Sequence, residues 1–124
     1  MQYLTTIEEF YEFVKTGRVM VLVISDFDGT SKYMKKLVDT EYYYAILLGY
    51  LNQKELNFKV GIIDIGVEVE KTAALATHLK IQSLPTSFFY KNGERIFFSV
   101  GADKKFIDFF HSELEVEKGN QSSG

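Results

Sequence analysis

The amino-acid sequence predicts an α/β fold with a mixed central sheet of four or five strands. Two apolar runs, residues 19–24 and 58–65, have the length and the β-branched content of strands that are buried on both faces. A long helical pattern separates them, and parallel neighbours in a sheet need such a crossover. Further on, Asn92-Gly93 stands between two more strand-like segments and predicts a tight hairpin. We therefore expect parallel strands first and an antiparallel pair near the C-terminal end.

The first half of the chain alternates helical and strand patterns. Thr5 or Thr6 can cap a helix whose apolar residues recur at helical spacing, and Gly17 is placed to end it. The strand at 19–24 follows. The next helical stretch runs from about Ser31 toward Asn52, and Tyr42-Tyr43-Tyr44 and Gly49 leave open whether it is one helix or two.

The second half begins with the strand at 58–65 and continues with a helix at 67–79. Residues 87–90 and 95–100 then form the two hairpin strands around a turn at 91–94. Asp103 can cap a last helix that buries its aromatic side. We assign residues 1–117 to a single domain and residues 118–124 to a flexible polar tail.

Four segments, in this order and at these offsets, resemble thioredoxins over about residues 4–114. They are Phe27 with Asp28-Gly29-Thr30-Ser31 and Lys32, then Leu84-Pro85-Thr86, then Phe89-Tyr90-Lys91-Asn92-Gly93-Glu94, then Val100-Gly101-Ala102. A thioredoxin carries an aromatic residue, Cys-Gly-Pro-Cys and lysine after its central strand. The resemblance implies a thioredoxin-like three-layer sandwich with a C-terminal antiparallel hairpin and helix, and a cis bond between Leu84 and Pro85.

The departures from that pattern concern the chemistry. The chain has no cysteine, and Asp28 and Ser31 stand at the two cysteine positions. Leu22 replaces the buried acid of the central strand, and Lys36 replaces the proline of the long helix. Without sulfur there is no dithiol exchange, so we expect a redox-inactive protein. The segments at 42–57 and 67–80 look longer than in a minimal thioredoxin. They are candidate locations for a function specific to this protein.

Composition limits the remaining function classes. The 124 residues are 46% hydrophobic and 25% charged, which suits one soluble domain. The net charge of -3, with no basic cluster, argues against nucleic acid or an anionic membrane as the partner. The N-terminal residues lack the pattern of a signal peptide, so we expect a cytoplasmic protein, although a cysteine-free chain suits any compartment.

A second family resemblance competes for the loop at 25–30. Ser25-Asp26-Phe27-Asp28-Gly29-Thr30 after a buried strand is similar to the first motif of haloacid-dehalogenase-type phosphatases. That resemblance would make Asp26 a nucleophile with bound magnesium and Asp28 its general acid/base. The preceding helix, the short chain that follows and the C-terminal hairpin argue against it.

Other polar and aromatic residues have ordinary interpretations. His78 and His111 are expected to be polar surface or cap residues, because no metal-ligand partners are spaced around them. The three tyrosines at 42–44 spread around a helix, so at least one should face the core, and a recognition patch is the alternative.

We favour a binding or adaptor module without catalytic residues, metal or cofactor. A protein or peptide partner would occupy the groove between the two loops formed by Phe27, Asp28, Gly29, Thr30 and Ser31 and by Leu84 and Pro85. Asp28 has two open interpretations, as an N-terminal helix cap or as a recognition residue.

Overall fold

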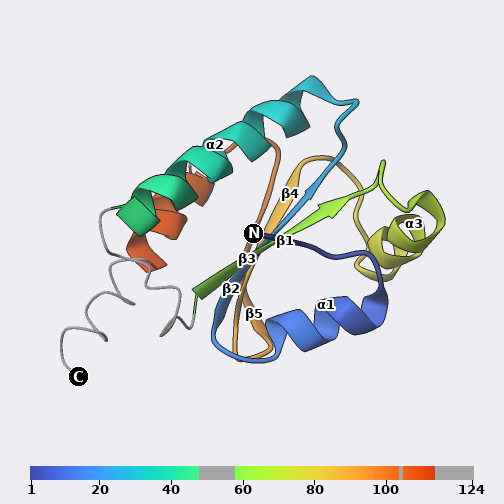
Figure 1. The fold of residues 1–124 in the computed structure, drawn as a ribbon, viewed down its shortest axis with the longest axis horizontal. Coiled ribbons are helices and arrows are strands. Elements are labelled where there is room, and N and C mark those ends of the chain that lie inside the picture. Colours follow the sequence, from blue (N-terminus) through green and yellow to red (C-terminus); the bar gives the residue numbers. More distant parts are fainter. Residues whose placement is uncertain (48–57, 104, 114–124) are drawn as a thin grey trace.

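The computed structural model describes residues 1–47, 58–103 and 105–113. Helices cover both faces of a five-stranded sheet (Figure 1). The elements are β1 (Gln2–Tyr3), α1 (Ile7–Val14), β2 (Arg18–Ile24), α2 (Gly29–Leu47), β3 (Phe58–Asp64), α3 (Val69–His78), β4 (Thr86–Lys91) and β5 (Glu94–Val100). Residues 105–113 form a final helix.

The sheet is mixed, with strand order β1-β3-β2-β4-β5. Strands β1, β3 and β2 are parallel, and β2 lies directly beside β3, as predicted. Strand β4 is antiparallel to β2 and pairs with β5. The hairpin turns at Asn92 and Gly93, whose φ angles of 50° and 86° are those that an Asn-Gly turn needs. The predicted fold class is confirmed.

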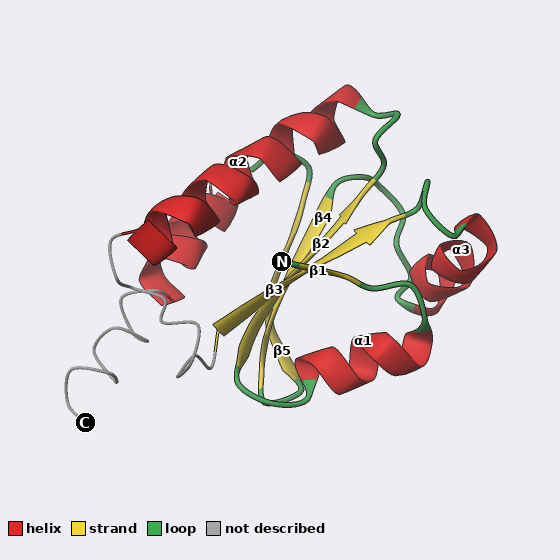
Figure 2. Ribbon diagram, in the orientation of Figure 1, coloured by secondary structure: helices red, strands yellow, loops and turns green. Residues whose placement is uncertain are grey.

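Helices lie on both sides of the sheet (Figure 2). Beneath them, each face of the sheet has its own apolar core. Strand β2 contributes to both, because alternate side chains point to opposite faces. Met20, Leu22 and Ile24 pack under α2 and the final helix. Val19, Val21 and Val23 pack under α1 and α3. This double burial accounts for the continuous apolar run in the sequence.

Helix α1 has a side-chain cap at its N-terminus, whereas the N-cap residue of α3, Glu68, makes no side-chain capping bond. Thr6 caps α1 in a capping box: its Oγ1 accepts a hydrogen bond from the Glu9 N–H, and the Glu9 side chain accepts one from the Thr6 N–H. Of the two threonines that the sequence offers as caps, Thr6 is therefore the one that caps the helix. Helix α2 begins at Gly29, two residues before the predicted start, and is continuous to Leu47. The predicted end of that helix at Asn52 and the polar tail at 118–124 lie outside the described residues.

Within the described ranges, no helix combines the length and apolar character needed to cross a membrane.

Candidate functional site

The candidate site lies where β2 and β3 end. Because these strands are parallel, their carboxyl ends meet at the same edge, which is the usual position of binding sites in α/β sheets. Ile24 lies opposite Asp64 in the register. Ser25 then turns the chain: its Oγ accepts a hydrogen bond from the Phe27 backbone and its carbonyl accepts one from Asp28. The turn leaves Phe27 90% exposed.

Asp28 caps helix α2. One carboxylate oxygen accepts hydrogen bonds from the Ser31 backbone N–H at 2.8 Å and from the Ser31 Oγ at 2.9 Å. This is the geometry of an N-cap residue bonding the third helical position, so the predicted cap role is confirmed. Ser31 is fully buried, with 0% exposure. Gly29 and Thr30 are exposed on the first turn.

The second loop of the site contains a cis bond between Leu84 and Pro85. Pro85 is buried, and its carbonyl accepts a hydrogen bond from the Gly101 N–H. The backbone N–H and C=O of the half-buried Leu84 make no hydrogen bond to any residue that the structure describes. The hydrogen-bonding capacity of both groups is therefore unused among these residues.

A groove of about 500 Å³ separates the two loops, and we call it the loop groove. Of the predicted site residues, Phe27, Asp28 and Leu84 line it. Gly29, Thr30, Ser31 and Pro85 do not. Its other lining residues, none of them predicted as site residues, are Ser25, Ile65, Ala76, Ile81, Gln82 and Ser83.

The end of α3 supplies one wall of the loop groove. The Ile81 N–H bonds the Ala76 carbonyl and the Lys80 N–H bonds the Thr77 carbonyl, with Lys80 at a φ of 58°. This is a Schellman motif, which brings residues around the helix end into contact. It brings both Ile81 and Ala76 to the groove. The usual sequence signal for such an end is glycine, and lysine stands here instead.

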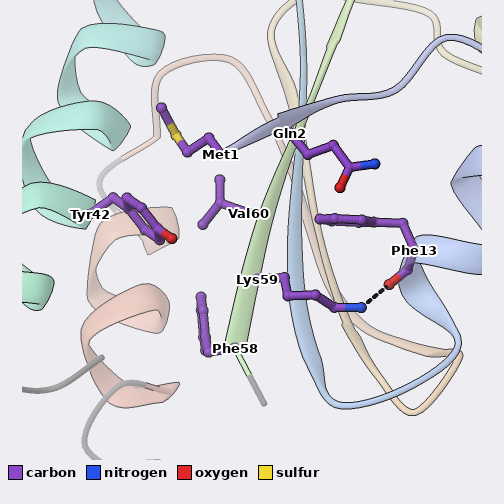
Figure 3. Close-up of a pocket in the computed structure, with 7 residues that line it drawn as sticks. All are labelled: Met1, Gln2, Phe13, Tyr42, Phe58, Lys59 and Val60. Carbon is purple, nitrogen blue, oxygen red and sulfur yellow. Dashed lines mark hydrogen bonds between the residues drawn. The ribbon is translucent and has the colours of Figure 1, made fainter. Parts of the chain in front are cut away.

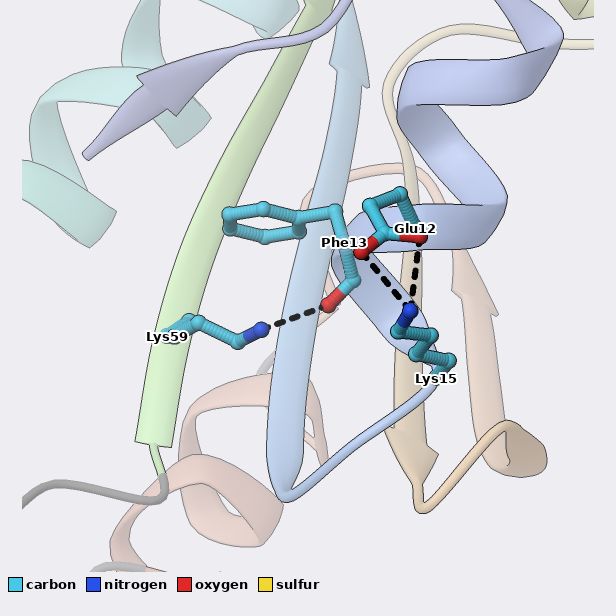
Figure 4. Close-up of polar contacts among 4 residues, drawn as sticks. All are labelled: Glu12, Phe13, Lys15 and Lys59. Atoms are coloured by element: carbon cyan, nitrogen blue, oxygen red, sulfur yellow. Dashed lines mark hydrogen bonds and ion pairs between the residues drawn. The ribbon is translucent and has the colours of Figure 1, made fainter.

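The opposite end of β3 carries a separate hollow of about 520 Å³ (Figure 3). Its lining comes from the N-terminal residues, β3, α1 and Tyr42 of α2. The Lys59 Nζ donates to the Phe13 carbonyl at 2.8 Å and lies 4.8 Å from the centre of the Phe13 ring. Burial lowers the pKa of Lys59; Glu12 partly opposes this and Lys15 adds to it (Figure 4).

The structure gives no support to an aspartate phosphatase. Asp28 uses its carboxylate to cap α2, and Asp26 is exposed in the loop. In the described part of the chain, no three His, Cys, Asp or Glu residues are grouped so that they could hold a metal ion. The antiparallel β4-β5 pair also differs from the parallel sheet that this resemblance implies.

The two histidines and the tyrosines considered in the sequence analysis can also be placed in the structure. The His78 Nε2 lies 2.7 Å from the Tyr11 hydroxyl, and the His111 Nε2 lies 2.6 Å from a Glu41 carboxylate oxygen. Tyr42 packs against the core beneath α2, whereas Tyr43 is exposed. The side chain of Tyr44 and residues 48–57 of the predicted extension lie outside the described part of the chain.

Solved structures of thioredoxins share this fold. The chain is similar to a Plasmodium falciparum thioredoxin, with a TM-score of 0.70, 16% identity and coverage of 91% of this chain and 98% of that one. It is similar to a Fasciola hepatica thioredoxin, with a TM-score of 0.71, 14% identity and coverage of 92% and 99%. No family model matches the sequence, and no curated protein matches it.

The fold is therefore the thioredoxin fold. The chain that adopts it contains no cysteine, with Asp28 and Ser31 at the positions where the resemblance places the two sulfur atoms. It is a cysteine-free protein with the thioredoxin fold, and thiol–disulfide exchange is not available to it.

Proposed function

We propose that this protein is a binding module that holds a protein or peptide partner in the loop groove. The observation that supports this proposal best is the exposed Phe27 ring beside a Leu84 backbone that forms no hydrogen bond to a described residue. An exposed aromatic side chain is a strong anchor for a partner, because it buries a large apolar area and has few rotatable bonds to immobilise.

The chemistry of the groove favours an extended peptide with an apolar side chain. Ile65, Ala76, Ile81 and Leu84 provide apolar walls around Phe27. The Leu84 N–H and C=O can pair with a peptide backbone as a short added strand, while the walls select the side chain. Asp28 is the acidic residue of the lining, and its capping bonds occupy one of its carboxylate oxygens.

The test is capture of partners from the native host with the wild-type protein and with Phe27→Ala, followed by titration of each identified partner. Phe27→Ala should lower the affinity by roughly tenfold or more, because it removes a central aromatic contact. Tyr33→Ala is the matched control, since Tyr33 is also an exposed aromatic residue but does not line the groove. It should bind as the wild type does.

Leu84→Ala tests the groove independently, because it shortens an apolar side chain of the other loop. It should also lower the affinity for the partner. The proposal fails if an identified partner binds the Phe27→Ala and Leu84→Ala variants as tightly as the wild-type protein. Circular dichroism of each variant shows whether the fold is retained.

A further inference from the structure

A second groove of about 410 Å³ lies on the sheet face that carries α1 and α3, beside the end of α3. We call it the strand groove. Its floor comes from the hairpin: Phe88 of β4 is buried, and Phe98 and Val100 of β5 are 52% and 49% exposed. Strand β5 is the last strand of the sheet order, so its outer edge has no neighbour among the described strands.

An irregularity in the β4-β5 pairing places a cation on this apolar floor. Phe89 pairs with Phe97 and Tyr90 pairs with Arg95, so Ile96 is an extra residue on β5. Without it, Arg95 and Phe98 would point to opposite faces, because side chains alternate along a strand. The bulge turns both to the same face. The Arg95 guanidinium carbon lies 5.3 Å from the centre of the Phe98 ring and 5.6 Å from that of Phe88.

The positive charge in the strand groove has no acidic counterpart among the described residues that line it. Arg95 and Lys80 line the groove, and no Asp or Glu does so in the part of the chain that the structure describes. Neither cation forms an ion pair with a described residue. A guanidinium held against aromatic rings keeps its planar N–H fork free for bidentate contact with a carboxylate.

The strand groove adjoins the loop groove, because residues 81–83 line both. A segment bound in one groove therefore lies next to the other. The loop groove offers apolar walls, and the strand groove offers a cation that lies against aromatic rings on an apolar floor.

We propose that the strand groove binds an acidic–apolar peptide segment of the protein partner, with a glutamate or aspartate carboxylate on Arg95 and a neighbouring apolar side chain on Phe98 and Val100. This site extends the proposed function and rests on it for the identity of the partner class. It adds a requirement for an acidic residue that the loop groove does not impose.

The probe is a capped octapeptide that alternates glutamate with leucine and phenylalanine, titrated into isotope-labelled protein and followed by backbone amide shifts. Saturable shifts should appear at residues 81–83 and 95–100. A matched peptide with glutamine in place of each glutamate should bind roughly tenfold more weakly, as loss of a charge-assisted hydrogen bond predicts.

Variants of the protein test the same contact from the other side. Arg95→Gln should weaken binding of the acidic peptide by roughly tenfold, and Arg95→Lys should fall between, because lysine keeps the charge without the planar fork. Lys91→Gln removes an exposed cation of β4 that does not line the groove and should leave affinity within about twofold. Unchanged amide dispersion elsewhere shows that each variant is folded.

Four results would overturn the proposal. They are an absence of saturable binding at millimolar peptide, equal affinity for the glutamine peptide, equal effects of Arg95→Gln and Lys91→Gln, and a reversible dimer in sedimentation that Arg95→Gln dissociates, which would make a second copy the occupant. Phe27→Ala separates the two proposals. If Phe27→Ala weakens partner binding while Arg95→Gln does not, the loop-groove proposal is supported and the strand-groove proposal is wrong. If Arg95→Gln weakens binding while Phe27→Ala does not, the strand-groove proposal is supported and the loop-groove proposal is wrong.

Discussion

Asp28 shows how a single residue can serve folding at a position where the resemblance to thioredoxins places a sulfur atom. Its carboxylate bonds both the N–H and the hydroxyl of Ser31 at the start of α2. These bonds satisfy a backbone donor that the helix itself leaves free. The cap also explains why α2 begins at Gly29 rather than at the predicted Ser31.

We predict that Asp28→Ala lowers the free energy of unfolding by about 1 kcal/mol, the usual cost of losing an N-cap. Asp28→Asn should keep most of that stability, because asparagine caps helices nearly as well. Urea denaturation of the three proteins measures the difference. Equal stability of the wild type and Asp28→Ala would show that the cap contributes nothing, and a loss of partner affinity without a loss of stability would instead favour the recognition role.

Lys59 should give the protein an alkaline rise in stability. Its pKa is lowered in the folded state by burial, from the ordinary value of 10.5. Below the folded pKa both states carry the proton, and the cost of burying the ammonium group is fully present. As pH rises from the lowered value toward 10.5, the unfolded chain binds more protons than the folded one, so the free energy of unfolding increases.

The measurement compares the pH dependence of unfolding in the wild type and Lys59→Met. The wild type should gain stability relative to the variant across that alkaline interval. Burial also raises the pKa of Tyr90 above 10.0, which lowers stability at higher pH, but both proteins retain Tyr90 and its contribution cancels. Lys36→Met, at an exposed lysine of α2, is the control, and parallel curves for all three proteins would contradict the prediction.

At the scale of elements, the contact of β3 with the N-terminal segment and α1 depends on a glycine. A Cβ added to Gly61 would lie 2.8 Å from a Phe13 ring atom and 2.9 Å from a Leu4 methyl carbon, and both side chains are buried. Gly61→Ala should therefore lower the free energy of unfolding by about 1–3 kcal/mol, the range for overpacking a core.

Gly29→Ala is the matched control for that substitution. Gly29 opens α2, and a Cβ there meets nothing within 4 Å. Alanine is the better helix former, so the variant should be as stable as the wild type or slightly more stable. Thermal unfolding of both variants checks the pair, and a Gly61→Ala protein as stable as Gly29→Ala would show that the packing around β3 adjusts freely.

The elements themselves were largely predictable, but their ends and irregularities were not. The buried runs at β2 and β3 and the Asn92-Gly93 turn carry strong local signals. The bulge at Ile96 has no local sequence signal, because bulged and regular strands share the same residue types. The Schellman motif at the end of α3 has none either, because lysine stands at position 80 where glycine would be the usual signal. These two features shape the groove walls.

For the molecule as a whole, we predict that the unmodified protein does not reduce a protein disulfide. The chain has no sulfur atom that can attack one, since its only sulfur is in three methionines. Insulin reduction with dithiothreitol, read as turbidity, should stay at the rate of the reductant alone. An acceleration above that rate would contradict the prediction.

Asp28→Cys with Ser31→Cys is the matched gain-of-function test. The Asp28 and Ser31 side chains meet at 2.9 Å, so two sulfur atoms at these positions can approach one another. The double variant should form an intramolecular disulfide, measured by thiol titration and mass. Its reduction activity should stay weak, because Leu22 occupies the place that the thioredoxin resemblance gives to a buried acid.

The sequence by itself determined the order of helices and strands, the hairpin and the loss of thiol chemistry, because each of these depends on local pattern or on composition. Only the tertiary structure decided which side chains meet. The loop groove joins Phe27, Ile65, Ala76 and Leu84, and the strand groove joins Arg95 to Phe98. The physical reason is that strand register and single-residue bulges set the face on which a side chain lies, and helix ends set where the next loop runs.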